Sequence, residues 1–201
     1  MEEIRRLHND EKRALIELVT QKGDSILDVG CGFGGDLQKW KKVGANINMC
    51  EPNENALNEA KSRAKNMKIR VNFYHGDIHS CPNRKYDIVC YNFALHYIFE
   101  DRDMFINSLQ AVKRRLKPGG RFIGIIPDSE KLIFKTPMTD DMGNFFKSEP
   151  LAHKDLLITQ LENTGFSMEK WEGLSGNPIT ELYSKFIFVY RNDSSGRTTH
   201  T

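Results

Sequence analysis

The sequence predicts an α/β fold, with a mostly parallel seven-stranded sheet and helices on both faces. Three observations support this prediction. Strand-like apolar runs alternate with segments of helical periodicity along most of the chain. A glycine-rich turn directly follows the first strand-like run, as in nucleotide-binding βαβ units. The 201 residues, 39% of them hydrophobic, suffice for one domain with a single core.

In the first half of the chain, strands are predicted where short apolar runs end at glycine or polar residues. Helices are predicted where apolar residues recur every three or four positions. The residues at 2–21 show this helical pattern, with Leu15, Leu18 and Val19 near one face. The expected order is a helix at 2–21, a strand at Ser25–Val29, a helix at Gly34–Val43, a strand at Asn46–Glu51, a helix at Asn55–Met67 and a strand at Ile69–His75.

In the second half, the apolar run Tyr86–Tyr91 is typical of a central strand that is covered on both faces. A helix at Asp101–Leu116 should end at the breaker cluster Lys117-Pro118-Gly119-Gly120. The remaining elements are a strand at Arg121–Pro127, an irregular stretch at Ser129–Ser148, a helix at Leu151–Thr164, and strands at Phe166–Trp171 and Leu182–Arg191. We expect one domain over residues 1–191 and a polar, disordered tail over 192–201.

Composition and charge exclude several classes of protein. No apolar run approaches the roughly 20 residues of a membrane span, and the N-terminus has no secretory apolar core. The net charge of +2 neither demands nor excludes nucleic acid. The four cysteines, Cys31, Cys50, Cys81 and Cys90, form no CxxC pair, which indicates buried thiols in a reducing compartment. No metal site is expected, because zinc would need closer Cys/His pairs.

The glycine turn and its acidic neighbours indicate a nucleotide-like ligand. Gly30, Gly32 and Gly35 satisfy GxGxxG, which alone is weak and also fits a purely structural turn. Asp28 stands just before this turn, and Glu51 closes the second strand, where a carboxylate can accept hydrogen bonds from ribose hydroxyls. After the third strand, Gly76-Asp77-Ile78 places an acceptor where an adenine amino group could donate.

Together, these motifs resemble the class I S-adenosylmethionine methyltransferases. LDVGCGFGGD, the acid that closes the second strand, GDI, YDIV and LKPGG occur in the family's order over about residues 26 to 127. The resemblance implies a Rossmann-like class I methyltransferase fold and S-adenosylmethionine as cofactor. A dinucleotide oxidoreductase is the competing interpretation of the glycine loop, but it explains neither GDI nor LKPGG.

The run from Asn92 to Glu100, directly after the fourth strand, has side chains suited to a planar base. Phe93 and Tyr97 can stack on a base, which is typically worth ~1–3 kcal/mol per base, and His96 can hydrogen-bond a base edge. The alternative is structural: Phe93, Leu95 and Tyr97 belong to the core, and His96 caps the next helix.

This run, FALHYIFE, resembles the messenger RNA cap guanine-N7 methyltransferases. Other segments agree with that family: the N-terminal helix with Asn9 and Lys12, GCGFGGDLQKW, GIIPD, Glu149, and Tyr183 at the start of the last strand. The resemblance implies cofactor contacts by Lys12, Asp28, Gly30, Gly32, Glu51, Asp77, Ile78, Asn92, Phe93 and Tyr97. It implies cap contacts by Asn9, Lys39, Arg63, Phe93, His96, Pro127, Glu149 and Tyr183, with Lys39 and Arg63 facing the triphosphate. For these two cations, an ordinary solvated helix face is the alternative.

The chain departs from the family pattern at four positions. Phe33 stands at a usual lysine, which puts one phosphate contact in doubt. Glu51 replaces the usual aspartate and Asn92 the usual glutamine. Each swap keeps the type of hydrogen-bonding group but changes the length of the side chain by one methylene. Asp10 occupies a usual tryptophan position.

The chemistry that the resemblance implies needs no acid, base or nucleophile. Guanine N7 carries an in-plane lone pair, so that no proton has to leave before attack. Catalysis then consists of orientation, which can be worth effective molarities of ~10⁵–10⁸ M. We expect Phe93, His96, Tyr97, Glu149 and Tyr183 to position the base.

Two alternatives remain open for the function. One is a methyltransferase that acts on a different small molecule, and the other is a module that binds cap or cofactor without turnover. The expected partners are the capped RNA 5′ end and other capping-enzyme domains or subunits, and not a membrane. The expected location is intracellular rather than secreted: cytoplasmic for a viral protein and nuclear for a cellular eukaryotic one.

Overall fold

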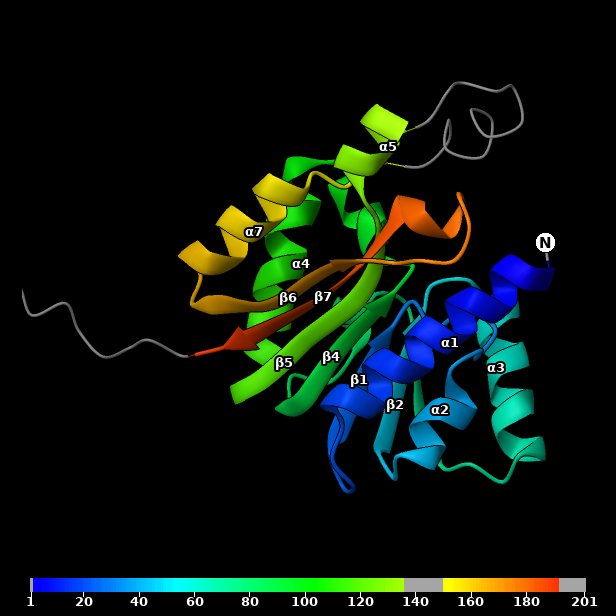
Figure 1. Ribbon diagram of the computed structural model, residues 1–201. Helices are drawn as coiled ribbons and strands as arrows, with labels where there is room; N and C mark the ends of the chain where they lie inside the picture. Colours follow the sequence, from blue (N-terminus) through cyan, green and yellow to red (C-terminus); the bar gives the residue numbers. More distant parts are fainter. Residues whose placement is uncertain (1, 136–149, 192–201) are drawn as a thin grey trace, which may run out of the picture.

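The computed structural model describes residues 2–135 and 150–191 (Figure 1). Its central feature is one seven-stranded sheet with the strand order β3-β2-β1-β4-β5-β7-β6. Strands β1 to β5 are parallel, whereas β7 runs antiparallel to both β5 and β6. The predicted α/β fold with seven mostly parallel strands is therefore confirmed.

The strands and helices follow in the expected alternation. The strands are β1 (Ser25–Val29), β2 (Asn46–Glu51), β3 (Val71–His75), β4 (Tyr86–Asn92), β5 (Leu116–Pro127), β6 (Phe166–Gly173) and β7 (Tyr183–Tyr190). The α-helices are α1 (Glu2–Val19), α2 (Leu37–Lys42), α3 (Glu54–Asn66), α4 (Arg102–Arg115), α5 (Ser129–Lys135) and α7 (Lys154–Asn163). Short 3₁₀ helices are η1 (Ile78–Ser80), η2 (Leu95–Glu100) and η3 (Thr180–Leu182).

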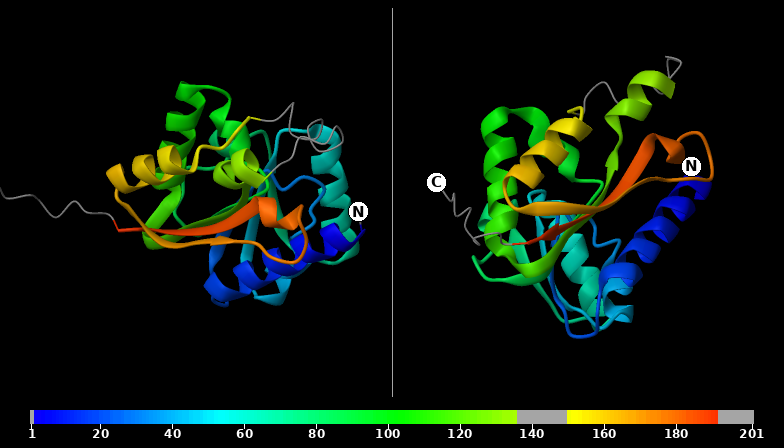
Figure 2. Two further views of the ribbon diagram at one scale, coloured as in Figure 1. Left: turned by 45° about the horizontal axis from the view of Figure 1, so that its top comes forward. Right: turned by 60° about the vertical axis from the view of Figure 1, so that its left-hand side comes forward.

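Helices cover both faces of the sheet, as the two further views show (Figure 2). On one face, α1 and α2 pack Leu15, Ile16 and Trp40 against strand residues such as Ile26 and Met49. On the other face, α4 and α7 contribute a second apolar layer, whose members include Phe105, Leu109, Val112, Leu157 and Leu161. The central strands bury side chains on both faces, which explains why they are apolar without alternation.

Two of the predicted boundaries were wrong for identifiable reasons. The helix expected from Gly34 begins only at Leu37, because the preceding residues form turns with positive φ at Gly30, Gly32 and Gly34. The strand expected from Arg121 begins at Leu116. Its register against β4 shifts between Tyr86 and Ile88, and this irregularity takes up the Lys117–Gly120 cluster.

Smaller differences concern the second half of the chain. The helix expected at Leu151–Thr164 spans only Lys154–Asn163, and the helix α5 occupies part of the stretch expected to be irregular. Cys50, Cys81 and Cys90 are buried, as expected, whereas Cys31 is partly exposed. The predicted tail at 192–201 lies outside the described residues.

The order of the strands fixes where a ligand can bind. After β1 the chain moves outward through β2 to β3, and then returns to place β4 on the other side of β1. At such a switch point the loops after β1 and β4 diverge and leave a crevice at the carboxyl ends of the strands. In Figure 1 this is the upper edge of the sheet, and α1 crosses in front of it.

Candidate functional site

The glycine loop Gly30–Asp36 forms the floor of the crevice after β1. Its tight path requires positive φ, at 71° for Gly30 and 52° for Gly32, which glycine adopts without strain. A Cβ on Gly30 would lie only 2.7 Å from the Cβ of Ala94, in the segment that follows β4. The missing side chain therefore lets the chain that leaves β1 pass close to the segment after β4 at the base of the crevice, before the two loops diverge. At Gly32 a Cβ would meet nothing within 4 Å, so that this part of the loop borders open space.

Glu51, at the end of β2, ties the loop to the next strand. One carboxylate oxygen accepts the backbone N–H of Gly32 at 2.9 Å, and the other accepts that of Asn53 at 2.9 Å. A carboxylate oxygen can accept two hydrogen bonds, so each keeps a site for a second donor. The prediction that Glu51 closes the second strand is confirmed, whereas its contact with a ligand stays a prediction.

Asp36 is the centre of a buried charge network that the sequence analysis did not identify. One of its carboxylate oxygens lies 2.8 Å from the ammonium nitrogens of both Lys12 and Lys39. Its other oxygen accepts the side-chain amide of Asn92 at 3.1 Å. Burial alone would raise the pKa of Asp36, but the two lysines outweigh it and lower the pKa. Asp36 thus joins α1, α2 and β4 as a carboxylate.

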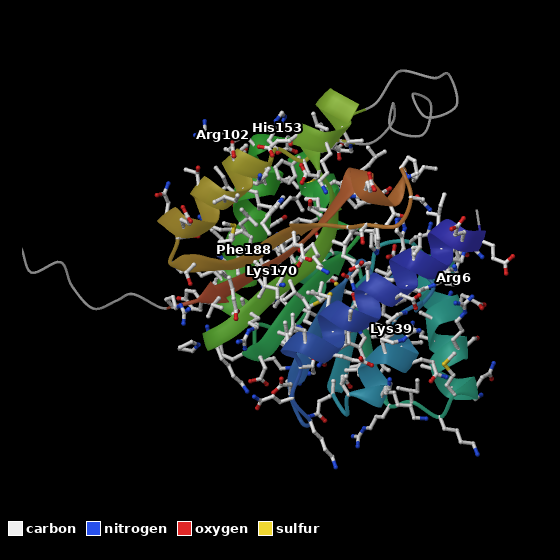
Figure 3. All side chains as sticks on the ribbon, in the orientation of Figure 1. Arg6, Lys39, Arg102, His153, Lys170 and Phe188 are labelled. Atoms are coloured by element: carbon white, nitrogen blue, oxygen red, sulfur yellow. The ribbon has the colours of Figure 1, made fainter. Side chains whose placement is uncertain are left out.

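The prediction that Lys39 faces a triphosphate is not supported by its position. Lys39 is 7% exposed, between α1 and α2 (Figure 3). Besides Asp36, its ammonium donates to the Gly35 carbonyl at 2.9 Å and to the side-chain oxygen of Asn9 at 3.1 Å. These three contacts engage all three of its protons. The alternative of a solvated helix face is wrong, because α1 covers this side of α2, and the phosphate contact stays a prediction that the burial of Lys39 does not favour.

Asp28 is also in a supporting position rather than on the surface of the crevice. It is 2% exposed, and its carboxylate accepts the indole N–H of Trp40 at 2.9 Å. The predicted cofactor contact by the Asp28 side chain is therefore not favoured. Burial, and next the neighbouring Asp36 carboxylate, raise the pKa of Asp28 to about 7. Trp40 itself is fully buried, so this hydrogen bond fixes α2 against β1.

The raised pKa of Asp28 predicts a pH dependence of stability. Between the unfolded pKa near ~3.9 and the folded value of about 7, the folded state binds more protons, so stability falls as pH rises through this window. Asp28→Asn keeps an acceptor for Trp40 but cannot ionise. We expect its melting temperature relative to the unmodified chain to rise between pH 5 and pH 8 in thermal unfolding. For Asp103→Asn, at an exposed position, the difference in melting temperature from the unmodified chain should not change with pH. If the difference for Asp28→Asn were also independent of pH, Asp28 would not have a raised pKa.

An aromatic cluster lies beside the charge network. Phe93, directly after β4, packs its ring 5.2 Å from the ring of Tyr183, at the start of β7. His8 of α1 lies 4.7 Å from Phe93 and 4.9 Å from Tyr183. The ammonium of Lys12 is 6.0 Å from the centre of the Phe93 ring. Three segments remote in sequence therefore bring predicted cofactor and cap residues together.

His8 was not singled out from the sequence, and only its place beside Asn9 could have indicated it. Burial, followed by the nearby Lys12 charge, lowers the pKa of His8. Its Nε2 is buried, and no described residue offers it a hydrogen-bond partner. His8 therefore contributes a neutral ring to the cluster, with one nitrogen left for another partner.

His96 and Tyr97, which are neighbours in η2, lie in contrasting environments. His96 is buried, with 3% exposed, whereas Tyr97 is 50% exposed. Their ring centres are 4.1 Å apart. The alternative that all three apolar residues of this run belong to the core is correct for Leu95 but wrong for Tyr97. An exposed tyrosine backed by a buried histidine forms a surface on which a planar group could rest.

The residues after β3 divide between surface and core. Asp77 is exposed, and one of its carboxylate oxygens caps η1 by accepting the backbone N–H of His79 at 2.9 Å. Ile78, in contrast, is 1% exposed and packs in the core beneath η1. The Ile78 side chain points into the protein and so does not face a ligand, whereas the predicted cofactor contact at this position stays a prediction.

The other predicted cap residues are only partly joined to the site. Pro127 is buried and pairs in register with Tyr183 across β5 and β7. Arg63 lies in the last turn of α3 and forms an ion pair with Glu59 at 3.0 Å. It follows Ala60 by one turn, and Ala60 packs against Gly34 of the glycine loop. Glu149 lies outside the described residues. Phe33, at the position where a lysine is usual, is 58% exposed.

The geometry together with a family comparison settles which family the chain belongs to. Residues 1–148 match the family of mRNA (guanine-N(7))-methyltransferase domains. The chain belongs to this family. A cap methyltransferase of Saccharomyces cerevisiae, named mRNA cap guanine-N(7) methyltransferase, is 34% identical over 201 residues, 92% of this chain and 44% of that protein. One from Oryza sativa is 33% identical over 156 residues, 69% of this chain and 42% of that protein. The chain thus spans less than half the length of these relatives.

Solved structures agree with the family at the level of the fold. A geranyl diphosphate C-methyltransferase from Streptomyces coelicolor has a TM-score of 0.72 at 15% identity, covering 93% of this chain and 81% of that one. An S-adenosylmethionine-dependent methyltransferase from Clostridium acetobutylicum has a TM-score of 0.70 at 16% identity, covering 92% and 91%. The predicted class I methyltransferase fold is confirmed. Among the described residues of this cap methyltransferase family member, no helix is long and apolar enough to cross a membrane.

The crevice residues fit S-adenosylmethionine, whose donors are an ammonium group, two ribose hydroxyls and the adenine amino group. The side-chain oxygen of Asn92 is buried, and no described residue donates to it. The Glu51 oxygens retain acceptor sites, and the space over Gly32 is open. No group of three or more metal-ligating side chains occurs within residues 2–135 and 150–191. The site therefore offers hydrogen-bond acceptors, one buried network of ion pairs and a cluster of aromatic rings.

Proposed function

We propose that this chain transfers a methyl group from S-adenosylmethionine to guanine N7 of the RNA 5′ cap. The observation that carries the proposal is the meeting of Phe93 and Tyr183 beside the acceptor edge formed by Glu51 and Asn92. A flat, aromatic substrate could thus lie next to a nucleoside-like donor. The family to which the chain belongs supports the same assignment.

On the donor side, Glu51 would accept from the ribose hydroxyls, and the Asn92 oxygen from the ammonium group. Asp77 would accept from the adenine amino group. When bound, the cofactor supplies a methyl group on a positively charged sulfur. Lys12 is held by Asp36 at 2.8 Å, which fixes α1 over the loop and helps to exclude water from this edge.

On the acceptor side, the chain has only to orient the base. Phe93, His96, Tyr97 and Tyr183 would restrict the plane of the guanine, and Glu149 would bind its edge. None of them has to remove a proton, because N7 presents a free lone pair. Orientation of this kind can supply effective molarities of ~10⁵–10⁸ M. The proposal thus contains no general base, no nucleophile and no metal.

The partners follow from the proposed reaction. Capped RNA 5′ ends are the substrate, and the reaction takes place inside the cell. Other domains or subunits of a capping apparatus are proposed as further partners, because the relatives that the chain matches are named as cap methyltransferases.

The direct test is methyl transfer with labelled S-adenosylmethionine. GpppA-capped RNA and uncapped RNA are incubated with the chain, and the product is digested to identify the methylated atom. We expect 7-methylguanosine from the capped RNA only. Transfer to small metabolites but not to capped RNA, or binding without transfer, would contradict the proposal.

Truncation of Tyr97 tests the role of the exposed ring. Because stacking on a base is worth ~1–3 kcal/mol, Tyr97→Ala should lower kcat/KM for capped RNA by about 10- to 100-fold. Tyr97→Phe should retain most of the activity if the ring is what matters. Met168→Ala, which removes a similarly exposed apolar side chain from β6, is the matched control and should be neutral. Equal kcat/KM for Tyr97→Ala and Met168→Ala would exclude Tyr97 from base positioning.

A further inference from the structure

A second polar recess lies at the edge of the sheet opposite to the proposed active site. It has a volume of about 650 Å³ and opens where β1, β2 and β3 begin, at the lower edge in Figure 1. Its lining is rich in cations and amides, with no aromatic ring and no carboxylate. The lining residues are Ser25, Lys41, Gly44, Ala45, Asn46, Ile47, Asn48, Lys68, Ile69, Arg70, Asn72 and Arg84.

The cations of this recess converge from three separate segments. Lys41 belongs to α2, Lys68 and Arg70 to the connection between α3 and β3, and Arg84 to the turn before β4. Lys22 adds a further cation at the rim, since its side chain would lie 2.9 Å from a Cβ on Gly44. In a chain with 29 basic and 27 acidic residues, four cations around one recess without a carboxylate are a local excess.

Most of this charge is available to a ligand. Within the described parts of the chain, neither Lys68 nor Arg70 has an ion-pair partner, and both are exposed. Among the residues that the structure describes, Lys41 donates to the carbonyl of Met67 alone, at 3.1 Å, and so keeps further donor protons. An ammonium or guanidinium without a partner favours an anion with several acceptor oxygens.

The floor of the recess is built and held in place. Asn48 is 1% exposed, and its amide donates to the Ile26 carbonyl at 3.0 Å. Its side-chain oxygen accepts from Asn72 at 3.0 Å and from the guanidinium of Arg84. These contacts hold Arg84 near the start of β2 and β3. They leave the positive charge of its guanidinium uncompensated, because amides carry no charge.

Two carboxylates beside Ser25, those of Asp24 and Asp87, have partners outside the recess. Asp87 accepts the backbone N–H of Ser25 and forms an ion pair with Lys117 at 2.8 Å. Asp24 accepts the backbone N–H of Gln21 at 2.8 Å. Neither lines the recess, so the field inside it is set by the cations.

We propose that this recess binds the phosphodiester backbone of single-stranded RNA downstream of the cap. A lining of cations and amides without aromatic rings suits phosphates rather than bases. The two edges of the sheet are separated by one strand, roughly 20 Å, which a stacked chain spans with about six nucleotides at ~3.4 Å each. The inference rests on the proposed function, because it treats the recess as a second contact for the same RNA.

The test compares two double variants that carry the same change of charge. Lys68→Asn/Arg70→Gln removes the unpaired cations of the recess, and asparagine tolerates the positive φ of 53° at position 68. Arg102→Gln/Lys170→Gln removes two cations on α4 and β6, in the other half of the molecule (Figure 3). Binding is measured by fluorescence anisotropy over a range of salt concentrations, without cofactor. The ligands are capped and 5′-triphosphate RNAs of 3 and 20 nucleotides.

We expect the unmodified chain to bind the 20-mers more tightly than the 3-mers. For the recess variant, Kd of both 20-mers should rise about tenfold, and the slope of log K against log salt should shrink by about 1.4, or 0.7 for each lost phosphate contact. Arg70→Gln alone should give half of that change in slope. The KM of the recess variant for the dinucleotide GpppA and its melting temperature should not change. The control variant should bind the 20-mers as tightly as the unmodified chain does.

Three results would overturn the inference: no gain in affinity from 3 to 20 nucleotides, equal losses in the two double variants, or an unchanged salt slope in the recess variant. Because the 5′-triphosphate RNA needs no methyl transfer, the binding result is independent of the proposed function. Loss of 20-mer binding in the recess variant of a chain that methylates no cap would sustain the inference and overturn the function.

Discussion

Replacing Asp36 by asparagine is expected to lower the melting temperature by roughly 6–20 °C. Asp36 lies 2.8 Å from both Lys12 and Lys39, and all three side chains are at most 15% exposed. Removing the shared carboxylate leaves two buried ammonium groups without a counter-charge, which costs about 3–5 kcal/mol. For a chain of this length, each kcal/mol corresponds to about 2–4 °C. Thermal unfolding followed by circular dichroism measures the shift.

The same substitution should also weaken cofactor binding, because Asp36 connects α1 and β4 at the crevice. Calorimetry with S-adenosylhomocysteine measures this effect. Asp10→Asn is the matched control, since it breaks the ion pair of Asp10 with Arg13 at the surface. The side chain of Asp10 is 56% exposed and that of Arg13 is 45% exposed. Such surface pairs contribute about 0–1 kcal/mol, so the control should shift the melting temperature by only a few degrees. If both variants unfolded at the same temperature, the ion pairs of Asp36 with Lys12 and Lys39 would not stabilise the fold.

Replacing Glu51 by glutamine should raise the Kd for S-adenosylmethionine by about 10- to 100-fold. Hydrogen bonds to a charged group are worth ~1.5–3 kcal/mol, and glutamine offers only one acceptor oxygen. Its amide N–H₂ would also face the backbone N–H of Gly32 or of Asn53, each of which now donates to Glu51 at 2.9 Å. The expected loss therefore combines a weaker ribose contact with a displaced glycine loop.

Two further variants separate charge from mere disturbance of the loop. Glu51→Asp keeps the carboxylate, shortened by one methylene, and should restore most of the affinity. Glu54→Gln removes a charge from the exposed first turn of α3 and should bind the cofactor normally. If Glu51→Gln bound as tightly as Glu54→Gln in calorimetry, Glu51 would have no part in holding the cofactor.

The order of the elements could be read from the sequence because each depends on near neighbours. The run Ser25–Val29 and the turn that follows were located correctly, since apolar residues and glycines act over a few positions. The break after α4 was also found, but its residues continue into β5 as an irregular stretch. Pairing with β4, thirty positions earlier, overrides the local tendency of a proline and two glycines.

The candidate site was only partly predictable, for a physical reason. Glu51 and Asn92 end strands, and strand ends can be located from local pattern. In contrast, Lys39 and Asp28 were assigned ligand contacts, yet packing against α1 and Trp40 buries them. The sequence shows which groups are charged but not which surfaces a distant helix covers.

By itself, the sequence determined the fold class, the glycine loop after β1 and the family, because these follow from short motifs and their order. Only the tertiary structure decided that Asp36 neutralises two lysines, that His8 joins Phe93 and Tyr183, and that four cations surround one recess. Burial and ion pairing depend on distances between segments far apart in the chain. Such distances arise only when the sheet and its helices have packed.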